Sequence, residues 1–173
     1  MLIMILGGAA SGKSEYAENL CMRLSASKLY IATMEPYGEE ALKRIERHRS
    51  MRKQKGFDTL EQYRELSEAE VKGYDTVLLE CMSTLLANEF FTGEDYYGNI
   101  MNGIEKLRNS CRHLVVITNR VFSDGEAYGE ETVSYMEALA GINRSLAALA
   151  DVVVEVVYSI PVILKGGKEL ESA

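Results

Sequence analysis

The feature that most constrains this chain is a glycine-rich segment near its start, Gly7-Gly8-Ala9-Ala10-Ser11-Gly12-Lys13-Ser14. The segment matches G-x-x-x-x-G-K-[ST], the pattern of a phosphate-binding P-loop. It follows an apolar run, residues 2–6, that is typical of a buried strand, and it precedes a helical pattern over residues 15–24. Because strand, loop and helix stand in the order that a P-loop requires, the segment predicts a nucleotide-binding site.

Each part of this motif has a physical role in holding phosphate. Glycines let backbone N–H groups turn inward around a phosphate chain, since no Cβ blocks the approach. The helix that follows points its N-terminal dipole at the same anion. We expect Lys13 to reach the β- and γ-phosphates and the Ser14 hydroxyl to bind Mg²⁺. A plain glycine-rich turn would not explain why lysine and serine occur together at the mouth of a helix.

Length and charge narrow the class of protein. The 173 residues are enough for one domain with a sizeable core, so we expect a single nucleotide-binding domain over residues 1–173. The formal net charge of −7 argues against a general nucleic-acid binder. Apolar runs are too short for a membrane span. The three cysteines are far apart and form no C-x-x-C pair, which suits reduced thiols in a cytoplasmic protein.

Strand-like apolar runs alternate with helical patterns along the rest of the chain. We expect further strands at residues 29–33, 57–61, 76–80, 114–118, 152–157 and 160–164, and helices at 39–55, 82–91, 100–109 and 132–148. A polar turn is expected at residues 93–98 and a long polar loop at 119–131. The alternation predicts an α/β, three-layer P-loop NTPase-like domain with a mostly parallel sheet. Its last two strands are close enough in sequence to form a hairpin at one edge.

A basic stripe is the second candidate site. Residues 43–55 carry seven of the chain's 19 basic residues, opposed only by Glu46. His48 lies in the middle, and Arg44 and Arg52 share its helical face at a spacing of four. In an acidic P-loop protein such a stripe indicates a polyphosphate site. The alternative is a solvated charged face with an incidental histidine, and composition and spacing alone favour that alternative.

Glu80 is the third candidate. It stands at the C-terminal end of a buried strand, where P-loop proteins place the carboxylate that organises Mg²⁺. The usual residue there is aspartate, and the longer glutamate requires a different reach. The alternative is a polar residue that begins a loop. We therefore expect Ser14 and Glu80 to hold Mg²⁺ together with GTP or ATP.

Several segments, in order, resemble one known family. They are the P-loop, Tyr30–Pro36, Arg44–Arg52 and Val77–Cys81, followed by a C-terminal signature at residues 141–143, 150–151 and 160–165. Together they resemble the bifunctional adenosylcobinamide kinase / adenosylcobinamide-phosphate guanylyltransferase family of cobalamin biosynthesis. The resemblance runs nearly end to end, and the order and spacing of the motifs carry it.

The resemblance implies a mechanism and a set of site residues. His48 would accept GMP from GTP and pass it to adenosylcobinamide phosphate, with Lys13 as the second catalytic residue. The corrinoid adenosylcobinamide would be the substrate, and the protein would form a homotrimer. The residues implied to contact nucleotide are Gly7, Gly8, Ala9, Ala10, Ser11, Gly12, Lys13, Ser14, Ala32, Thr33, Met34, Arg49, Ser50, Met51, Arg52, Glu61 and Glu80.

The chain also departs from the family pattern. The family usually has arginine at Ala10, tryptophan at Phe57, aspartate at Glu80 and glycine at Ser159, and a different loop where residues 120–124 stand. Two other interpretations therefore stay open. One is a P-loop kinase for another small molecule that works without a histidine intermediate. The other is a nucleotide-sensing protein that kept the P-loop and lost the chemistry.

Overall fold

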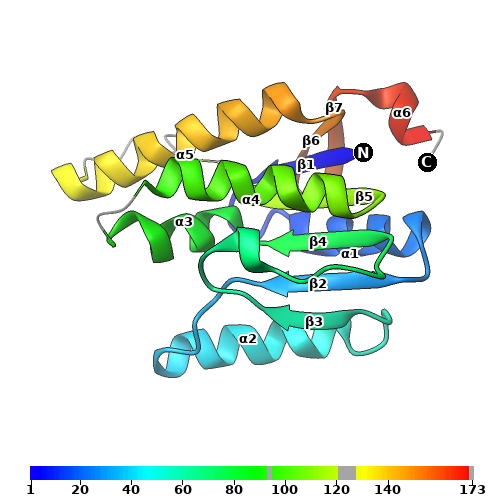
Figure 1. The fold of residues 1–173 in the computed structure, drawn as a ribbon, viewed down its shortest axis with the longest axis horizontal. Helices are drawn as coiled ribbons and strands as arrows, with labels where there is room; N and C mark the ends of the chain where they lie inside the picture. Colours follow the sequence, from blue (N-terminus) through cyan, green and yellow to red (C-terminus); the bar gives the residue numbers. More distant parts are fainter. Residues whose placement is uncertain (93–94, 121–127, 172–173) are drawn as a thin grey trace.

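The computed structural model describes residues 1–92, 95–120 and 128–171 and, within them, every side chain except those of Arg44 and Met51. Its strands are β1 (Leu2–Gly7), β2 (Lys28–Ala32), β3 (Asp58–Glu61), β4 (Thr76–Glu80), β5 (His113–Asn119), β6 (Val152–Val157) and β7 (Ile160–Lys165). Its helices are α1 (Lys13–Leu24), α2 (Gly38–Arg52), the 3₁₀ turn η1 (Leu66–Glu68), α3 (Met82–Phe90), α4 (Tyr96–Ser110), α5 (Glu130–Leu149) and α6 (Gly167–Glu171). Figure 1 shows the sheet lying between helices.

The strands form one sheet in the order β3-β2-β4-β5-β1-β6-β7. All neighbouring pairs are parallel except β6 and β7, which pair antiparallel. β1 is an interior strand that lies between β5 and β6. The loop that follows its carboxyl end therefore has strands of the sheet on both sides. The three-layer α/β domain with an edge hairpin, predicted from the sequence, is confirmed.

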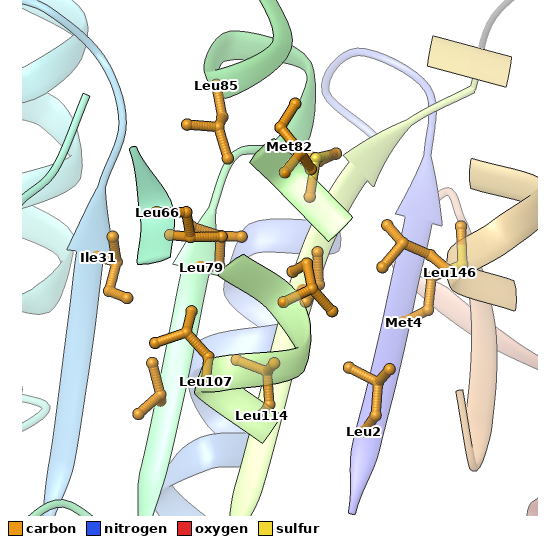
Figure 2. Close-up of a cluster of buried hydrophobic side chains, with 14 of the residues drawn as sticks. Leu2, Met4, Ile31, Leu66, Leu79, Met82, Leu85, Leu107, Leu114 and Leu146 are labelled. Carbon is orange, nitrogen blue, oxygen red and sulfur yellow. The ribbon is translucent and has the colours of Figure 1, made fainter. Parts of the chain in front are cut away.

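Alternate residues of β1 explain why its apolar run is continuous. Leu2 and Met4 face one cluster of buried side chains, and Ile3 and Ile5 face the other. Helices α3, α4 and α5 cover the first face, as Figure 2 shows around Leu85, Leu107 and Leu146. Helix α1 covers the second face. Fully burying one such side chain contributes roughly 1.5–3 kcal/mol, so both faces of the sheet are firmly held.

Two parts of the fold lack this apolar anchoring. Helix α2 lies beside β3 in Figure 1, and among its described side chains no apolar one is buried. Strand β7 is exposed along its whole length, with Ile160 65% and Leu164 57% accessible. Since β6 pairs with only one side of β7, the other side is a free edge in the described part of the chain.

Some predicted boundaries were wrong for local reasons. Residues 96–98, expected in a turn, form the first turn of α4, because the Asp95 side chain caps that helix by accepting from the Gly98 N–H at 2.9 Å. Helix α2 ends at Arg52 and not at residue 55, and β3 begins after Phe57. The sequence did not predict η1 or α6. Of the expected loop 119–131, residues 121–127 lie outside the described part, as do residues 93–94 of the expected turn.

No helix in the described ranges is both long and apolar enough to cross a membrane.

Two glycines in long helices give a matched test of the packing. A Cβ added at Gly103 of α4 would lie 2.7 Å from the Leu66 Cβ and 3.0 Å from the Ser67 backbone nitrogen. Gly103→Ala should therefore lower the free energy of unfolding by about 1–3 kcal/mol. A Cβ at Gly141 of α5 would meet only the end of the Arg144 side chain, at 3.9 Å. Gly141→Ala should raise the free energy of unfolding by about 0.5–1 kcal/mol, as measured by urea denaturation. Equal effects of the two substitutions would contradict this packing.

Candidate active site

The P-loop forms the turn between β1 and α1, as predicted. Gly12 has φ 88°, a conformation that favours glycine, and immediately precedes the first residue of α1. A Cβ at Gly7 would lie 2.7 Å from the Val156 carbonyl oxygen, and one at Gly12 would lie 2.5 Å from the Ser159 Oγ. The glycines are therefore required by the turn itself and by its contact with the β6–β7 hairpin. The Ser159 N–H donates to the Ser11 carbonyl at 2.8 Å and fixes that contact.

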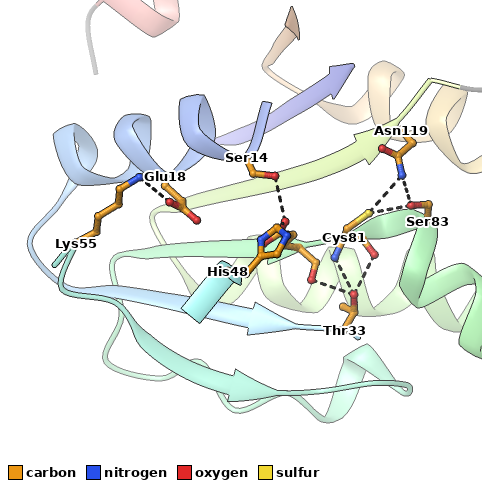
Figure 3. Close-up of polar contacts among 9 residues, drawn as sticks. Ser14, Glu18, Thr33, His48, Lys55, Cys81, Ser83 and Asn119 are labelled. Atoms are coloured by element: carbon orange, nitrogen blue, oxygen red, sulfur yellow. Dashed lines mark hydrogen bonds and ion pairs between the residues drawn. The ribbon is translucent and has the colours of Figure 1, made fainter. Parts of the chain in front are cut away.

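Lys13 and Ser14 extend from the start of α1. The Lys13 ammonium donates to the Gly8 carbonyl at 3.0 Å, so its side chain folds back over the loop. The Ser14 hydroxyl donates to Glu80 Oε1 at 3.1 Å, which joins α1 to the carboxyl end of β4 (Figure 3). The predicted proximity of Ser14 and Glu80 is thus observed, although they are 66 residues apart in the sequence.

A cavity of about 810 Å³ opens above the P-loop, at the carboxyl ends of the parallel strands. Most of the predicted nucleotide-binding residues line it: Ala9, Ala10, Ser11, Gly12, Lys13, Ser14, Ala32, Thr33, Met34, Arg49, Arg52, Glu61 and Glu80, together with His48. Gly7, Gly8 and Ser50 do not line it, and the Met51 side chain lies outside the description. The structure therefore gathers residues from five stretches of the sequence, 9–14, 32–34, 48–52, 61 and 80, into one space.

His48 lies directly beside Glu80. Its Nδ1 is 3.0 Å from Glu80 Oε1, and the two side chains are 23% and 10% exposed. Because Oε1 also accepts from the Ser14 hydroxyl, one carboxylate oxygen meets both the P-loop helix and the histidine of α2. The His48 ring does not lie on a solvated face, since it is mostly buried and lines the cavity.

Some side chains of the basic stripe at residues 43–55 line the cavity, and others lie on the surface. Arg47, Arg49 and Arg52 line the cavity, and Arg49 also donates to Glu61 Oε1 at 2.6 Å. Lys43 points elsewhere and pairs with Glu39 on the exposed side of α2. The shared face predicted for His48 and Arg52 is observed, while the Arg44 side chain lies outside the description.

Arg52 is almost completely buried. Its guanidinium carbon lies 3.3 Å from the centre of the Tyr30 ring, so the two groups stack. Burial lowers the pKa of Arg52 to about 10, and the negative charge of Glu18 opposes that lowering. At neutral pH the guanidinium is therefore still charged, and its positive field reaches the cavity.

The Glu80 carboxyl has a strongly perturbed pKa. Burial raises this pKa to about 7, while the hydrogen bond from Ser14 and the charge of Lys13 act in the opposite direction. Strongly perturbed pKa values of this kind cluster at functional sites. Glu80 Oε2 is buried without a hydrogen-bond partner in the described structure, so one oxygen remains to be satisfied.

Magnesium fits the oxygen donors at this point. Mg²⁺ prefers one or two protein oxygens and completes its shell with water and substrate phosphate. The Ser14 hydroxyl and the Glu80 carboxylate supply such oxygens, and Glu80 Oε2 has no other partner. The described residues contain no cluster of three or more His, Cys, Asp or Glu that could hold a metal by themselves.

Sequence reasoning missed several cavity residues. Tyr30, Thr59, Cys81, Ser83, Asn119, Arg120 and Ser159 line the cavity beside those predicted. A hydrogen-bond network joins some of them: the Cys81 N–H donates to Thr33 Oγ1 at 2.7 Å, and Asn119 donates to Ser83 Oγ at 2.5 Å (Figure 3). For Cys81, Ser83, Asn119 and Arg120, the position at or just after the carboxyl ends of β4 and β5 is the signal that could have identified them.

Comparison with known proteins agrees with this geometry. A family model described as "Cobinamide kinase / cobinamide phosphate guanyltransferase" matches residues 3–164. The chain belongs to this family. The "Bifunctional adenosylcobalamin biosynthesis protein CobU" of Escherichia coli K12 is 34% identical, with 95% of this chain and 100% of that protein covered. The protein of the same name from Salmonella typhimurium is also 34% identical, over 95% of this chain and all of its own length.

A more distant relative is the "Bifunctional adenosylcobalamin biosynthesis protein CobP" of Pseudomonas aeruginosa. It is 27% identical, with 94% of this chain and 96% of that protein covered. Ala10 and Ser159, which the sequence resemblance marked as departures from the family pattern, both line the cavity and both have positive φ, 55° and 64°. These two positions therefore lie at the cavity, in the P-loop and in the β6–β7 turn that contacts it.

The raised pKa of Glu80 predicts how the metal-free protein responds to pH. The folded protein binds this proton more tightly than the unfolded chain, whose glutamate titrates near its ordinary value of 4.5. The contribution of Glu80 to stability is therefore greatest below about pH 4.5 and is lost as the pH rises through about 7.

Glu80→Gln should remove this loss. In EDTA, the variant should gain about 1–3 kcal/mol over the wild type between pH 4.5 and pH 8, as measured by urea denaturation across that range. A pH-independent difference between the two proteins would show that the carboxyl titrates normally.

Proposed function

We propose that this protein is a cobalamin-biosynthesis enzyme that phosphorylates adenosylcobinamide and then transfers GMP from GTP to adenosylcobinamide phosphate. The observation that carries the proposal is the meeting of His48 and Ser14 of the P-loop at one oxygen of Glu80. A nucleophile candidate is thereby held beside a phosphate-binding loop in a single cavity. Family membership supports the same two reactions, as do the names of the relatives.

The proposed guanylyl transfer uses His48 as a covalent relay. Because Nδ1 faces Glu80, we assign the attack to Nε2. Nε2 forms a bond to the α-phosphorus of GTP while the bond to the β-phosphate oxygen breaks, and pyrophosphate leaves. A phosphate oxygen of adenosylcobinamide phosphate then attacks the same phosphorus, and the P–N bond breaks. Two easier displacements replace one difficult displacement.

The surrounding residues have proposed roles in binding the nucleotide. The loop Gly7 to Ser14 would surround the phosphates with N–H groups, and Lys13 would supply a positive charge to them. Arg49 and Arg52, on α2, would stabilise charge on the phosphoryl oxygens during transfer. The remaining proposed contacts are Ala32, Thr33, Met34, Ser50, Met51, Glu61 and Glu80.

The proposed kinase step uses the same loop. GTP or ATP would bind with its phosphates on the P-loop, and the hydroxyl of adenosylcobinamide would receive the γ-phosphoryl group. We propose that Ser14 and Glu80 hold Mg²⁺ here. When bound, Mg²⁺ neutralises phosphate charge in reactions of this kind.

We also propose that the protein is a homotrimer, as its family resemblance implies. The exposed apolar edge strand β7 supports assembly, since monomers seldom leave such an edge uncovered. Sedimentation at micromolar concentration should give the mass of a trimer. Leu164→Lys, at a position 57% exposed, should shift that mass towards the monomer with an unchanged circular dichroism spectrum. A monomeric wild type would contradict the proposal.

The central prediction is a guanylylated histidine. Wild-type protein incubated with Mg²⁺ and GTP labelled at the α-phosphate should gain one GMP by intact mass. The adduct should be labile in acid and stable in base, as expected for a phosphoramidate. His48→Ala should remove the adduct and keep triphosphate binding, because the P-loop holds the phosphates independently.

Two variants serve as controls for this experiment. His113→Asn should keep the adduct, since His113 begins β5 and does not line the cavity. Lys13→Ala should lose both the adduct and tight triphosphate binding. If the wild type forms no adduct, or if the adduct survives in His48→Ala, the histidine mechanism is wrong. A P-loop kinase without a histidine intermediate would then be the better interpretation.

A further inference from the structure

Helix α2 carries the proposed nucleophile, yet none of its described apolar side chains is buried in the core. Leu42 is half exposed. Most helices in globular proteins are held by an apolar stripe that packs on the core. The described contacts that hold α2 and His48 are therefore mainly polar.

One such contact comes from Glu18 on helix α1. Glu18 is fully buried, and its Oε2 accepts from the Lys55 ammonium at 2.6 Å (Figure 3). Lys55 follows the last residue of α2 by three positions. Glu18 also stands four residues after Ser14, so both side chains lie on the same side of α1. A single helix face therefore contacts Glu80 through Ser14 and the end of α2 through Glu18.

Arg52 provides a second link between Glu18 and α2. It is the last residue of α2, it is 94% buried, and it stacks on Tyr30 of β2. Glu18 carries the negative charge that opposes the lowering of the Arg52 pKa by burial. Glu18 Oε1 and Arg52 Nη1 are both buried without hydrogen-bond partners in the described structure. Glu18 therefore attracts the Arg52 guanidinium electrostatically, without a direct hydrogen bond between them.

We propose that Glu18 is a positioning residue for guanylyl transfer, which fixes the C-terminal end of α2 and thereby aims His48 at the phosphates. His48 precedes Arg52 by one helical turn, so a shift of the helix end moves the imidazole with it. This inference rests on the function proposed above, because it assigns His48 its chemistry. It adds a residue that does not line the cavity and that the reaction itself does not require.

The chemistry of the contact suits this role. A buried carboxylate must be paired, and its partners are held in a narrow range of positions once water is excluded. Since a displacement of about 1 Å at a reacting group can reduce a rate by roughly 100-fold, a rigid helix end matters more to transfer than to nucleotide affinity.

The test compares two lysines of the same segment. Lys55→Met removes the buried partner of Glu18, and Lys43→Met removes an exposed partner of Glu39 in a pair whose side chains are 79% and 91% accessible. Glu18→Gln removes the carboxylate itself, and Lys55→Arg keeps the charge. For each variant we would measure the rate of adduct formation by rapid quench and the affinity for a GTP analogue that cannot be cleaved at the α-phosphate. Hydrogen exchange over residues 45–52 and the melting temperature complete the set.

Lys55→Met and Glu18→Gln should slow adduct formation by roughly 10- to 100-fold, with analogue affinity changed by less than about threefold. Hydrogen exchange over residues 45–52 should be faster in both. Lys43→Met should resemble the wild type, and Lys55→Arg should restore most of the rate. The double variant should be no slower than the slower single variant, because both substitutions remove one contact.

Three results would overturn the proposal. One is an unchanged adduct rate in folded Lys55→Met. Another is a parallel loss of adduct rate, analogue affinity and melting temperature, which would assign the pair to general stability. The third is unchanged hydrogen exchange over residues 45–52 in Glu18→Gln. Hydrogen exchange also separates this inference from the proposed function. If the wild type forms no adduct, the histidine mechanism fails. Faster exchange in Lys55→Met but not in Lys43→Met would still show that the Glu18–Lys55 ion pair holds the end of α2 in place.

Discussion

The candidate site depends on the contacts that the Glu80 carboxylate makes with Ser14 and His48. Through one oxygen the carboxylate meets the Ser14 hydroxyl from α1 and the His48 ring from α2, two helices that otherwise approach each other across the cavity. Its position at the carboxyl end of a buried strand is fixed by the sheet, so the two helices are aligned to a rigid reference. The pKa of Glu80 is raised because burial disfavours the charged form of its carboxyl group. The phosphate loop and the histidine are therefore parts of one polar centre.

The parts of this architecture that are formed by residues adjacent in the sequence could be predicted from the sequence. The P-loop is continuous in the chain, and apolar runs such as residues 2–6 announce strands buried on both faces. The distance of 3.0 Å between His48 and Glu80 could not be predicted from spacing, because the sheet topology brings them together. Family resemblance supplied the significance of His48, which composition alone assigned to a solvated face. Asp95 and η1 were missed because a single cap and a short turn leave little trace in a pattern of apolar residues.

The cavity residues that were missed share one property. Asn119, Ser83 and Tyr30 come from different strands or from the segments that follow them, and each is ordinary in its local sequence. They become neighbours because parallel strands end at the same edge of the sheet. Helix α2 is the opposite case, since its charges are conspicuous in sequence while their partners are not. Which lysine is a surface charge and which is buried against Glu18 depends on the end of a helix that the sequence placed three residues too late.

The contact between the P-loop and the β6–β7 turn makes positions 12 and 159 epistatic. Ser159 has a left-handed backbone conformation that glycine adopts with less strain. Its hydroxyl oxygen would lie only 2.5 Å from a Cβ added at Gly12. A serine-to-glycine change at 159 would clear that hydroxyl, yet Gly12 would stay constrained by its own φ of 88°. Glycine at position 159 would therefore be tolerated by the hairpin, whereas a side chain at position 12 would remain strained even after that exchange.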